Sequence, residues 1–75
     1  MDINQFIAAL APAFVESGSL LTPETNYKDL SDWNSLTTLM VFTTIGQQFN
    51  VSLEVSDLYE AETIEQLYNI VRARQ

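Results

Sequence analysis

Residues 27–36 of the sequence, YKDLSDWNSL, decide the fold. The stretch carries turn-forming Asp, Ser and Asn. Near its end are Asn34 and Ser35, two residue types that commonly cap the start of a helix. Apolar residues at helical spacing follow it as far as Phe49. The stretch therefore predicts the end of a loop and the start of a helix that Asn34 or Ser35 caps and that ends near Phe49.

This predicted helix has two different faces, because successive residues are about 100° apart around the axis. One face carries the bulkiest apolar side chains and should lie against the core. It comprises Phe42, Ile45 and Phe49, with Thr38, Leu39 and Val41 at its margins. The opposite face lies beside Ser35 and should be exposed. It comprises Leu36, Met40, Thr43, Thr44 and Gln47.

The residues before the helix predict a first helix and a long loop. Asp2 with Gln5 has the spacing of a capping box, and apolar residues then recur at helical spacing to about residue 16. Pro12 should bend or split this helix, and Gly18 is expected as its C-terminal cap. Residues 19–34 have no sustained period and should form a long ordered loop. The residues expected to pin it are Leu20, Leu21, Tyr27, Leu30 and Trp33.

The residues after the helix predict two more helical segments. Val51–Val55 alternates like a strand but has no second strand to pair with, so we expect a connecting segment. A short helical turn should follow near residues 56–60, and Thr63 with Gln66 predicts a capped last helix over residues 64–74. The chain is thus expected to be a single all-α domain, residues 1–75, with three main helices, one short helix and a long first loop.

Composition narrows the possible functions. The 75 residues include ten acidic and three basic side chains, no cysteine and no histidine, for a net charge of -7. Disulfides, thiolate zinc sites and cysteine nucleophiles are excluded, and the usual near-neutral proton carrier is missing. The acidic side chains lack the spacing of a calcium loop, so we expect no metal site. The sequence therefore predicts a protein that is not an enzyme.

The same composition indicates the kind of partner and location. Nucleic acid is not expected, since the only cations are Lys28, Arg72 and Arg74, whereas a basic protein partner suits the charge. No secretory signal and no membrane-length apolar run is present, and an apolar share of 47% argues against disorder. A cytoplasmic monomer is expected.

The loop ending in Asp32-Trp33-Asn34-Ser35-Leu36, the apolar helix and the later Asp57-Leu58 and Thr63-Ile64 resemble the acyl carrier protein family over nearly the whole chain. In that family the serine of an Asp-Ser-Leu motif carries 4'-phosphopantetheine, delivered from coenzyme A by a phosphopantetheinyl transferase. The resemblance implies this role for Ser35. It also implies that the fold is a small four-helix bundle and that the carrier is free-standing. Such a carrier holds acyl intermediates as thioesters. Its partners would be acyl-transferring, condensing or acyl-activating enzymes of fatty-acid, polyketide or related biosynthesis.

Two departures from the family pattern shape the expected partner surface. Asn34 stands where the family usually has Asp, and residues 35–50 contain no charged side chain, although the family usually places acids there. We therefore expect partners to contact this helix through apolar and neutral polar side chains. The predicted partner-binding residues are Leu36, Met40, Thr43, Thr44, Gln47, Asp32 and Asp57. Charge attraction is expected from Asp29, Asp32, Glu54, Asp57, Glu60 and Glu62.

Alternatives remain open at this point. A peptidyl or aminoacyl carrier usually has Gly-Gly where this chain has Asp32-Trp33, and in an unmodified helical interaction module Ser35 would only cap the helix. Trp33 is interpreted as a packing anchor. Thr38 and Gly46 could leave room for a cargo chain between the second and third helices.

Overall fold

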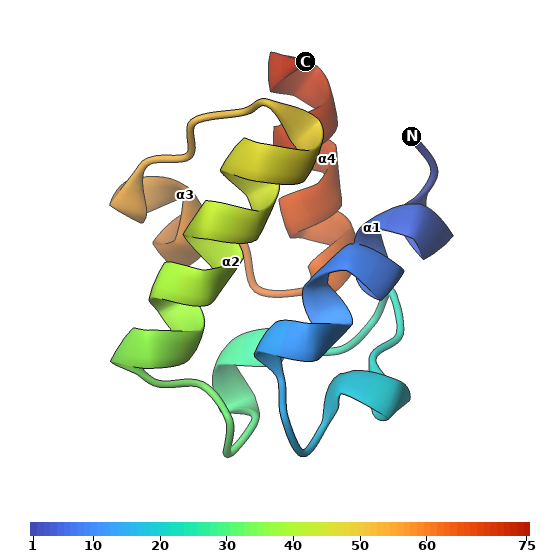
Figure 1. The fold of residues 1–75 in the computed structure, drawn as a ribbon, viewed down its shortest axis with the longest axis vertical. Helices are drawn as coiled ribbons and strands as arrows, with labels where there is room; N and C mark the ends of the chain where they lie inside the picture. Colours follow the sequence, from blue (N-terminus) through green and yellow to red (C-terminus); the bar gives the residue numbers. More distant parts are fainter.

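The computed structural model describes residues 1–75 and consists of helices and turns (Figure 1). The four α-helices are α1 (Ile3–Leu10), α2 (Ser35–Phe49), α3 (Val55–Glu60) and α4 (Ile64–Arg74). Short 3-10 turns occupy Ala11–Ala13, Gly18–Leu20 and Tyr27–Asp29. The only β-type pairing is an isolated bridge between Asn26 and Thr63. The predicted all-α bundle, with one short helix and a long first loop, is confirmed.

The first helix begins as predicted but ends earlier. The amide of Gln5 donates to the Asp2 carboxylate at 2.9 Å, and the Gln5 side chain accepts from the Asp2 amide at 3.0 Å. The α-helix ends at Leu10 rather than near residue 16, because Pro12 lacks an N–H and turns the chain into a 3-10 segment. Gly18 is not a left-handed cap, since its φ is not positive. It is needed for space, because a Cβ there would collide with the Ala11 carbonyl oxygen.

The long first loop is ordered by burial of some of its predicted anchors. Leu21 and Tyr27 are buried, and Leu30 and Trp33 are half-buried. Leu20 was expected among the anchors, but it is 75% exposed because it ends a 3-10 turn at the surface. The anchors that do pack tie the loop to the bundle.

The core side of α2 differs from the prediction. Its buried residues are Thr37, Val41 and Ile45, whereas Phe42 and Phe49 are half-buried. Leu39, expected at the margin of the core face, is 61% exposed. The helix is apolar around much of its circumference, so the positions of α1 and α4 decide which side is covered.

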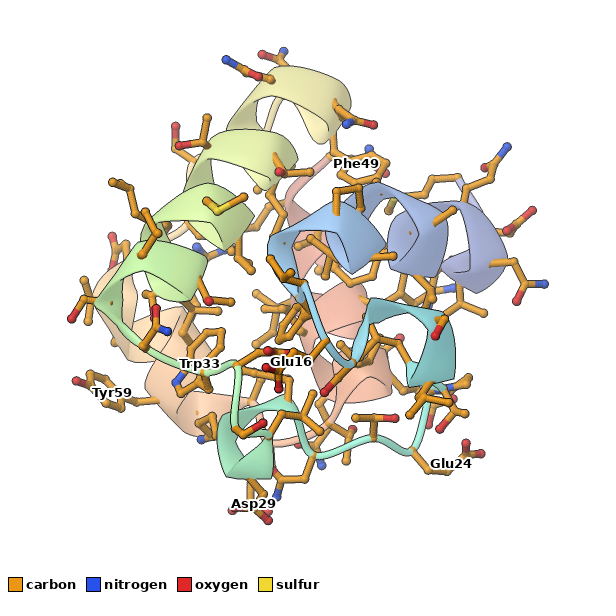
Figure 2. All side chains as sticks on the ribbon, turned by 60° about the horizontal axis from the view of Figure 1, so that its bottom comes forward. Glu16, Glu24, Asp29, Trp33, Phe49 and Tyr59 are labelled. Carbon is orange, nitrogen blue, oxygen red and sulfur yellow. The ribbon has the colours of Figure 1, made fainter.

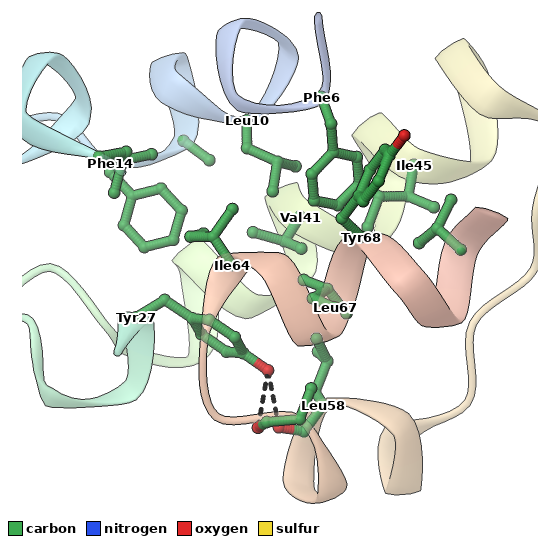
Figure 3. Close-up of a cluster of buried hydrophobic side chains, with 14 of the residues drawn as sticks. Phe6, Leu10, Phe14, Tyr27, Val41, Ile45, Leu58, Ile64, Leu67 and Tyr68 are labelled. Atoms are coloured by element: carbon green, nitrogen blue, oxygen red, sulfur yellow. Dashed lines mark hydrogen bonds between the residues drawn. The ribbon is translucent and has the colours of Figure 1, made fainter. Parts of the chain in front are cut away.

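The core lies where α1, α2 and α4 meet (Figure 3). The Phe6 ring lies 5.6 Å from the rings of both Phe49 and Tyr68. Leu67 and Val71 of α4 are buried in the same cluster. Burial of these side chains stabilises the arrangement of the three long helices.

The C-terminal half follows the prediction closely. The short helix begins at Val55, one residue before the expected Ser56, and α4 covers the predicted 64–74. Thr63 accepts from the Gln66 amide at 3.2 Å, which completes the predicted cap. None of the helices has the length and continuous apolar character needed to cross a membrane.

Candidate functional site

Aromatic packing fixes the chain just before α2. The Trp33 ring stacks on Phe14, with centroids 6.2 Å apart and planes 15° apart. The edge of one ring meets the face of the other between Trp33 and Tyr27, at 5.0 Å and 63°. Figure 2 shows Trp33 beside the start of α2. Trp33 is therefore a packing anchor, as predicted, and it sets the position from which α2 begins.

Tyr27 links this anchor to α3 and to the segment that follows it. Its hydroxyl lies 3.0 Å from the Leu58 carbonyl oxygen and 3.1 Å from that of Ala61, and both contacts are buried (Figure 3). Burial raises the pKa of the Tyr27 hydroxyl, because the phenolate would lose its hydration. Tyr27 thus remains a neutral donor that connects the loop to the segment between α3 and α4.

Asp32 joins the segment before α2 to the loop after α1. Its carboxylate accepts from the amides of Ser17 at 2.8 Å and Glu16 at 3.4 Å. Its carbonyl oxygen accepts from the Thr37 hydroxyl at 2.6 Å. Asp32 was predicted to bind a partner, but much of its hydrogen-bonding capacity is used inside the chain.

Asn34, not Ser35, caps α2. The Asn34 side-chain oxygen accepts from the Thr37 amide at 2.9 Å, and its carbonyl oxygen accepts from the Thr38 amide at 2.9 Å. Ser35 is the first residue of the helix and is exposed. Its hydroxyl has no hydrogen-bond partner, and the amides of Ser35 and Leu36 have no acceptor within the chain. The helix start therefore presents a free hydroxyl beside two free N–H groups.

The face of α2 beside Ser35 is exposed and uncharged. Leu36 is 67% exposed, Met40 36%, and Thr43 and Gln47 are also exposed, while Thr44 is half-buried. Sequence reasoning missed three further exposed apolar side chains on α2 and α3. They are Leu39, Val55 and Tyr59. Val55 and Tyr59 are spaced by four residues, a helical repeat that could have indicated a shared face.

Asp57 is not part of an exposed surface, which corrects its placement among the partner-binding residues and the attracting acids. It is 4% exposed, and both of its carboxylate oxygens accept from the guanidinium of Arg74, one of them at 2.6 Å. It also accepts from the Glu54 amide at 2.8 Å. Asp57 therefore holds α3 against the end of α4. The acids that remain exposed are Asp29, Glu54, Glu60 and Glu62.

A cavity of about 70 Å³ lies next to the start of α2. It is lined by Lys28, Trp33, Thr38, Val55, Leu58 and Tyr59. The expected room beside Thr38 is therefore present. The expected contribution of Gly46 is wrong, because Gly46 is exposed and the space at its Cα is bordered by the Val51 carbonyl oxygen.

The residues at the start of α2 fit an attached phosphodiester. A phosphate joined to the Ser35 oxygen would lie beside the two free N–H groups, at the positive end of the helix dipole. The first turn of α2 contains no acidic residue that would repel it. A long flexible arm fits there as well, since Ser35 and Leu36 both face solvent.

Comparison with known proteins gave one positive result. A family model described as "Phosphopantetheine attachment site" matches residues 4–71. Comparison with curated proteins and with solved structures gave no match. Members of this family are non-catalytic carriers with covalently attached 4'-phosphopantetheine. The matched region includes all of α2 and α3 and most of α1 and α4, and the chain belongs to the phosphopantetheine attachment site family of carrier proteins.

Proposed function

We propose that Ser35 carries the 4'-phosphopantetheine group and that the protein presents acyl intermediates to enzymes of fatty-acid, polyketide or related biosynthesis. One observation carries the choice of residue. The Ser35 hydroxyl is exposed and unbonded because Asn34 has taken over the capping of α2. A serine that capped the helix would have its oxygen occupied by a backbone amide.

The attachment step uses the geometry of the helix start. The Ser35 oxygen attacks the phosphorus next to the pantetheine of coenzyme A, forms the new P–O bond and displaces adenosine 3',5'-bisphosphate. The hydroxyl proton passes to a base of the transferase. The free amides of Ser35 and Leu36 lie where they can stabilise the negative charge of the resulting phosphodiester. When bound, the group supplies the thiol that this chain lacks and holds cargo as a thioester.

Two features support an acyl rather than a peptidyl carrier. The residues before Asn34 are Asp32 and Trp33 rather than Gly-Gly, and both are tied into the bundle by hydrogen bonds and ring packing. The net charge of -7 also favours a strongly acidic carrier with basic partners. The transferase is one such partner, and acyl-transferring, condensing or acyl-activating enzymes are the others.

The proposed docking surface is the exposed face of α2 with the neighbouring apolar side chains of α3. It comprises Leu36, Leu39, Met40, Thr43, Thr44, Gln47, Val55 and Tyr59. The exposed acids Asp29, Glu54, Glu60 and Glu62 attract a basic partner over a longer range, whereas apolar contact stabilises the complex. Asp57 is left out because its buried carboxylate is paired with the guanidinium of Arg74.

The test is incubation with coenzyme A and a broad-specificity phosphopantetheinyl transferase, followed by intact mass. We expect the mass of one phosphopantetheine group to be added to the wild type and none to Ser35→Ala. Ser56→Ala is the matched control, because Ser56 is an exposed serine in the first turn of α3, and it should be modified like the wild type. Modification of Ser35→Ala would show that another residue is the attachment site.

A further inference from the structure

The cavity beside Ser35 has one cation on its wall. Lys28 is half-buried, and its ammonium group donates to the Tyr59 carbonyl oxygen at 2.9 Å. The other lining side chains are Trp33, Thr38, Val55, Leu58 and Tyr59. An ammonium group has three donors, and only one of them has an acceptor within the chain. The cavity is thus apolar over most of its wall and carries a positive charge with unused hydrogen-bonding capacity.

This cation is unpaired in a chain that has a large excess of acids. The only salt bridge is between Arg74 and Asp57, and the remaining arginine, Arg72, lies over the Tyr68 ring at 5.4 Å. Lys28 therefore contacts none of the ten acidic side chains. A lone cation beside an apolar cavity is suited to an anion that comes from outside the chain.

The cavity also lies close to Ser35, the proposed attachment site. Trp33 precedes Ser35 by two residues, and Thr38 is one helical turn beyond it on the same side of α2. Tyr59 and Trp33, both of which line the cavity, lie on the same side of the molecule in Figure 2. An arm that starts at Ser35 therefore begins beside the cavity and not on the far side of the bundle.

The size of the cavity limits what can enter it. An apolar cavity of about 150 Å³ accommodates benzene. The cavity here, at about 70 Å³, has roughly half that volume. It can accept a chain of a few carbons without rearrangement of the core, and a long hydrocarbon chain would have to displace packed side chains.

We propose that this cavity receives short acyl chains that end in a carboxylate, with the methylene groups against Trp33 and Leu58 and the carboxylate paired with Lys28. The inference rests on the proposed attachment at Ser35 and adds the class of cargo. The charge of the rest of the chain opposes an anionic cargo, since the net charge is -7. Lys28 is therefore the residue on which discrimination between anionic and neutral cargo depends.

The test compares two cargoes of equal length. The wild type is modified at Ser35 with the transferase and either glutaryl-coenzyme A or pentanoyl-coenzyme A, and intact mass confirms each loading. Melting temperature and the fluorescence of Trp33, the only tryptophan, are then measured. We expect the glutaryl form to melt about 4 °C above the pentanoyl form in low salt, and the difference to shrink in 1 M salt. The emission of Trp33 should differ between the glutaryl form and the unloaded, modified protein.

Lys28→Gln is the decisive variant. Without the ammonium group, the glutaryl form should melt no higher than the pentanoyl form, because only repulsion from the acidic chain remains. Arg72→Gln removes a cation outside the cavity and should leave the wild-type order unchanged.

Three results would overturn the inference while leaving the proposed attachment at Ser35 intact. If the glutaryl form of Lys28→Gln melts as far above its pentanoyl form as in the wild type, Lys28 does not bind the carboxylate. Trp33 emission unaffected by any cargo would show that the cavity stays empty. A Lys28-dependent rise in melting temperature on attachment of the unloaded arm, with no further rise for glutaryl, would show that Lys28 binds the phosphodiester. If mass shows no addition at Ser35, the proposed attachment fails, and the inference fails with it.

Discussion

The backbone amides in the first turns of α2 and α4 are hydrogen-bonded to different extents. In α4 all four leading amides have acceptors. They are Ile64 to the Thr25 carbonyl (3.0 Å), Glu65 to the Pro23 carbonyl (2.9 Å), Gln66 to the Thr63 hydroxyl (3.2 Å) and Leu67 to the Thr63 carbonyl (3.0 Å). In α2 only Thr37 and Thr38 have acceptors, both on Asn34.

The two helix starts therefore differ in how many backbone amides remain free to bind another group. The start of α4 lies against the loop of residues 23–27, where unsatisfied amides would be costly, so every one is paired. The start of α2 faces solvent, where water can satisfy free amides at little cost. Two donors and a hydroxyl therefore remain free at the one helix start where the proposed modification occurs.

The largest effect is expected from Tyr27→Phe, which removes the hydroxyl that links the first loop to α3 and to the segment before α4. This change leaves the buried carbonyl oxygens of Leu58 and Ala61 without a donor, which should lower the free energy of unfolding by about 2 kcal/mol. Urea unfolding measures the loss. Tyr59→Phe is the control, since Tyr59 is 75% exposed, and it should unfold like the wild type. Equal stability of both variants would contradict the role given to the Tyr27 hydroxyl.

The same residue predicts a pH dependence. The pKa of Tyr27 is raised in the folded state, so the unfolded chain loses the hydroxyl proton first, at about pH 10. The stabilisation that the protonated Tyr27 hydroxyl gives the folded state is complete below that pH and should decline as the pH rises above it. Unfolding in urea at pH 8 and pH 10.5 should show a decline in the wild type that is smaller in Tyr27→Phe. A parallel decline in both proteins would assign the effect to other groups.

A somewhat smaller effect is expected from placing a negative charge at the start of α2, beside its two free amides. Leu36→Glu puts a carboxylate beside the free amides, where it should repel the incoming phosphate and lower kcat/KM of the transferase reaction about ten-fold relative to Leu36→Gln. Stability should not fall, since an acid in the first turn favours the helix dipole. Time courses of intact mass measure the rate. Equal rates for the Glu and Gln variants would show that a negative charge at position 36 does not hinder the approach of the phosphate.

Removing the two caps in turn compares the helix starts directly. Asn34→Ala and Thr63→Ala should each cost about 1 kcal/mol. The melting temperature of a domain of this size should then fall by about 4–8 °C. Only Asn34→Ala should slow modification, because only Asn34 leaves the Ser35 hydroxyl free. Equal slowing by Thr63→Ala would mean that overall stability, rather than the geometry at Ser35, governs the transferase reaction.

The smallest effect is expected from Asn34→Asp, which introduces the residue usual in the family. The added charge at the cap should stabilise the helix by about 0.5 kcal/mol through the helix dipole. The gain should disappear in 1 M salt, where exposed charges are screened. Chemical denaturation at both salt concentrations tests this, and a gain that persists in 1 M salt would point to a change in packing instead.

Helix starts were the features best predicted from sequence. Asp2 with Gln5 and Thr63 with Gln66 cap α1 and α4 as predicted, because these signals act between residues close in the chain. Pro12 was expected to bend or split a helix that continued to about residue 16, but α1 ends at Leu10. The covered side of α2 was predicted less well. Its apolar residues surround much of the helix, so only the packing of α1 and α4 could select Val41 and Ile45 and leave Leu39 in solvent.

The surroundings of the charged side chains were also predicted poorly from the sequence. Asp57 was interpreted as an exposed acid, but Arg74, 17 residues further along, meets it across α3 and α4. Lys28 was counted only as one of three cations, and its place on the wall of a cavity depends on Leu58 and Tyr59, which lie about 30 residues further along the chain in α3. Such contacts have no local sequence signal.

By itself the sequence determined an acidic helical domain, the positions of its helix starts, the missing thiol and the serine at the head of the second helix. Each of these depends on residue chemistry or on hydrogen bonds between residues three or four apart. The structure showed that Asn34 rather than Ser35 is the cap, and tertiary contacts alone decided that Asp57 is buried against Arg74 and that Lys28 faces a cavity. Those outcomes depend on which segments meet in space, and packing of the whole chain is what brings them together.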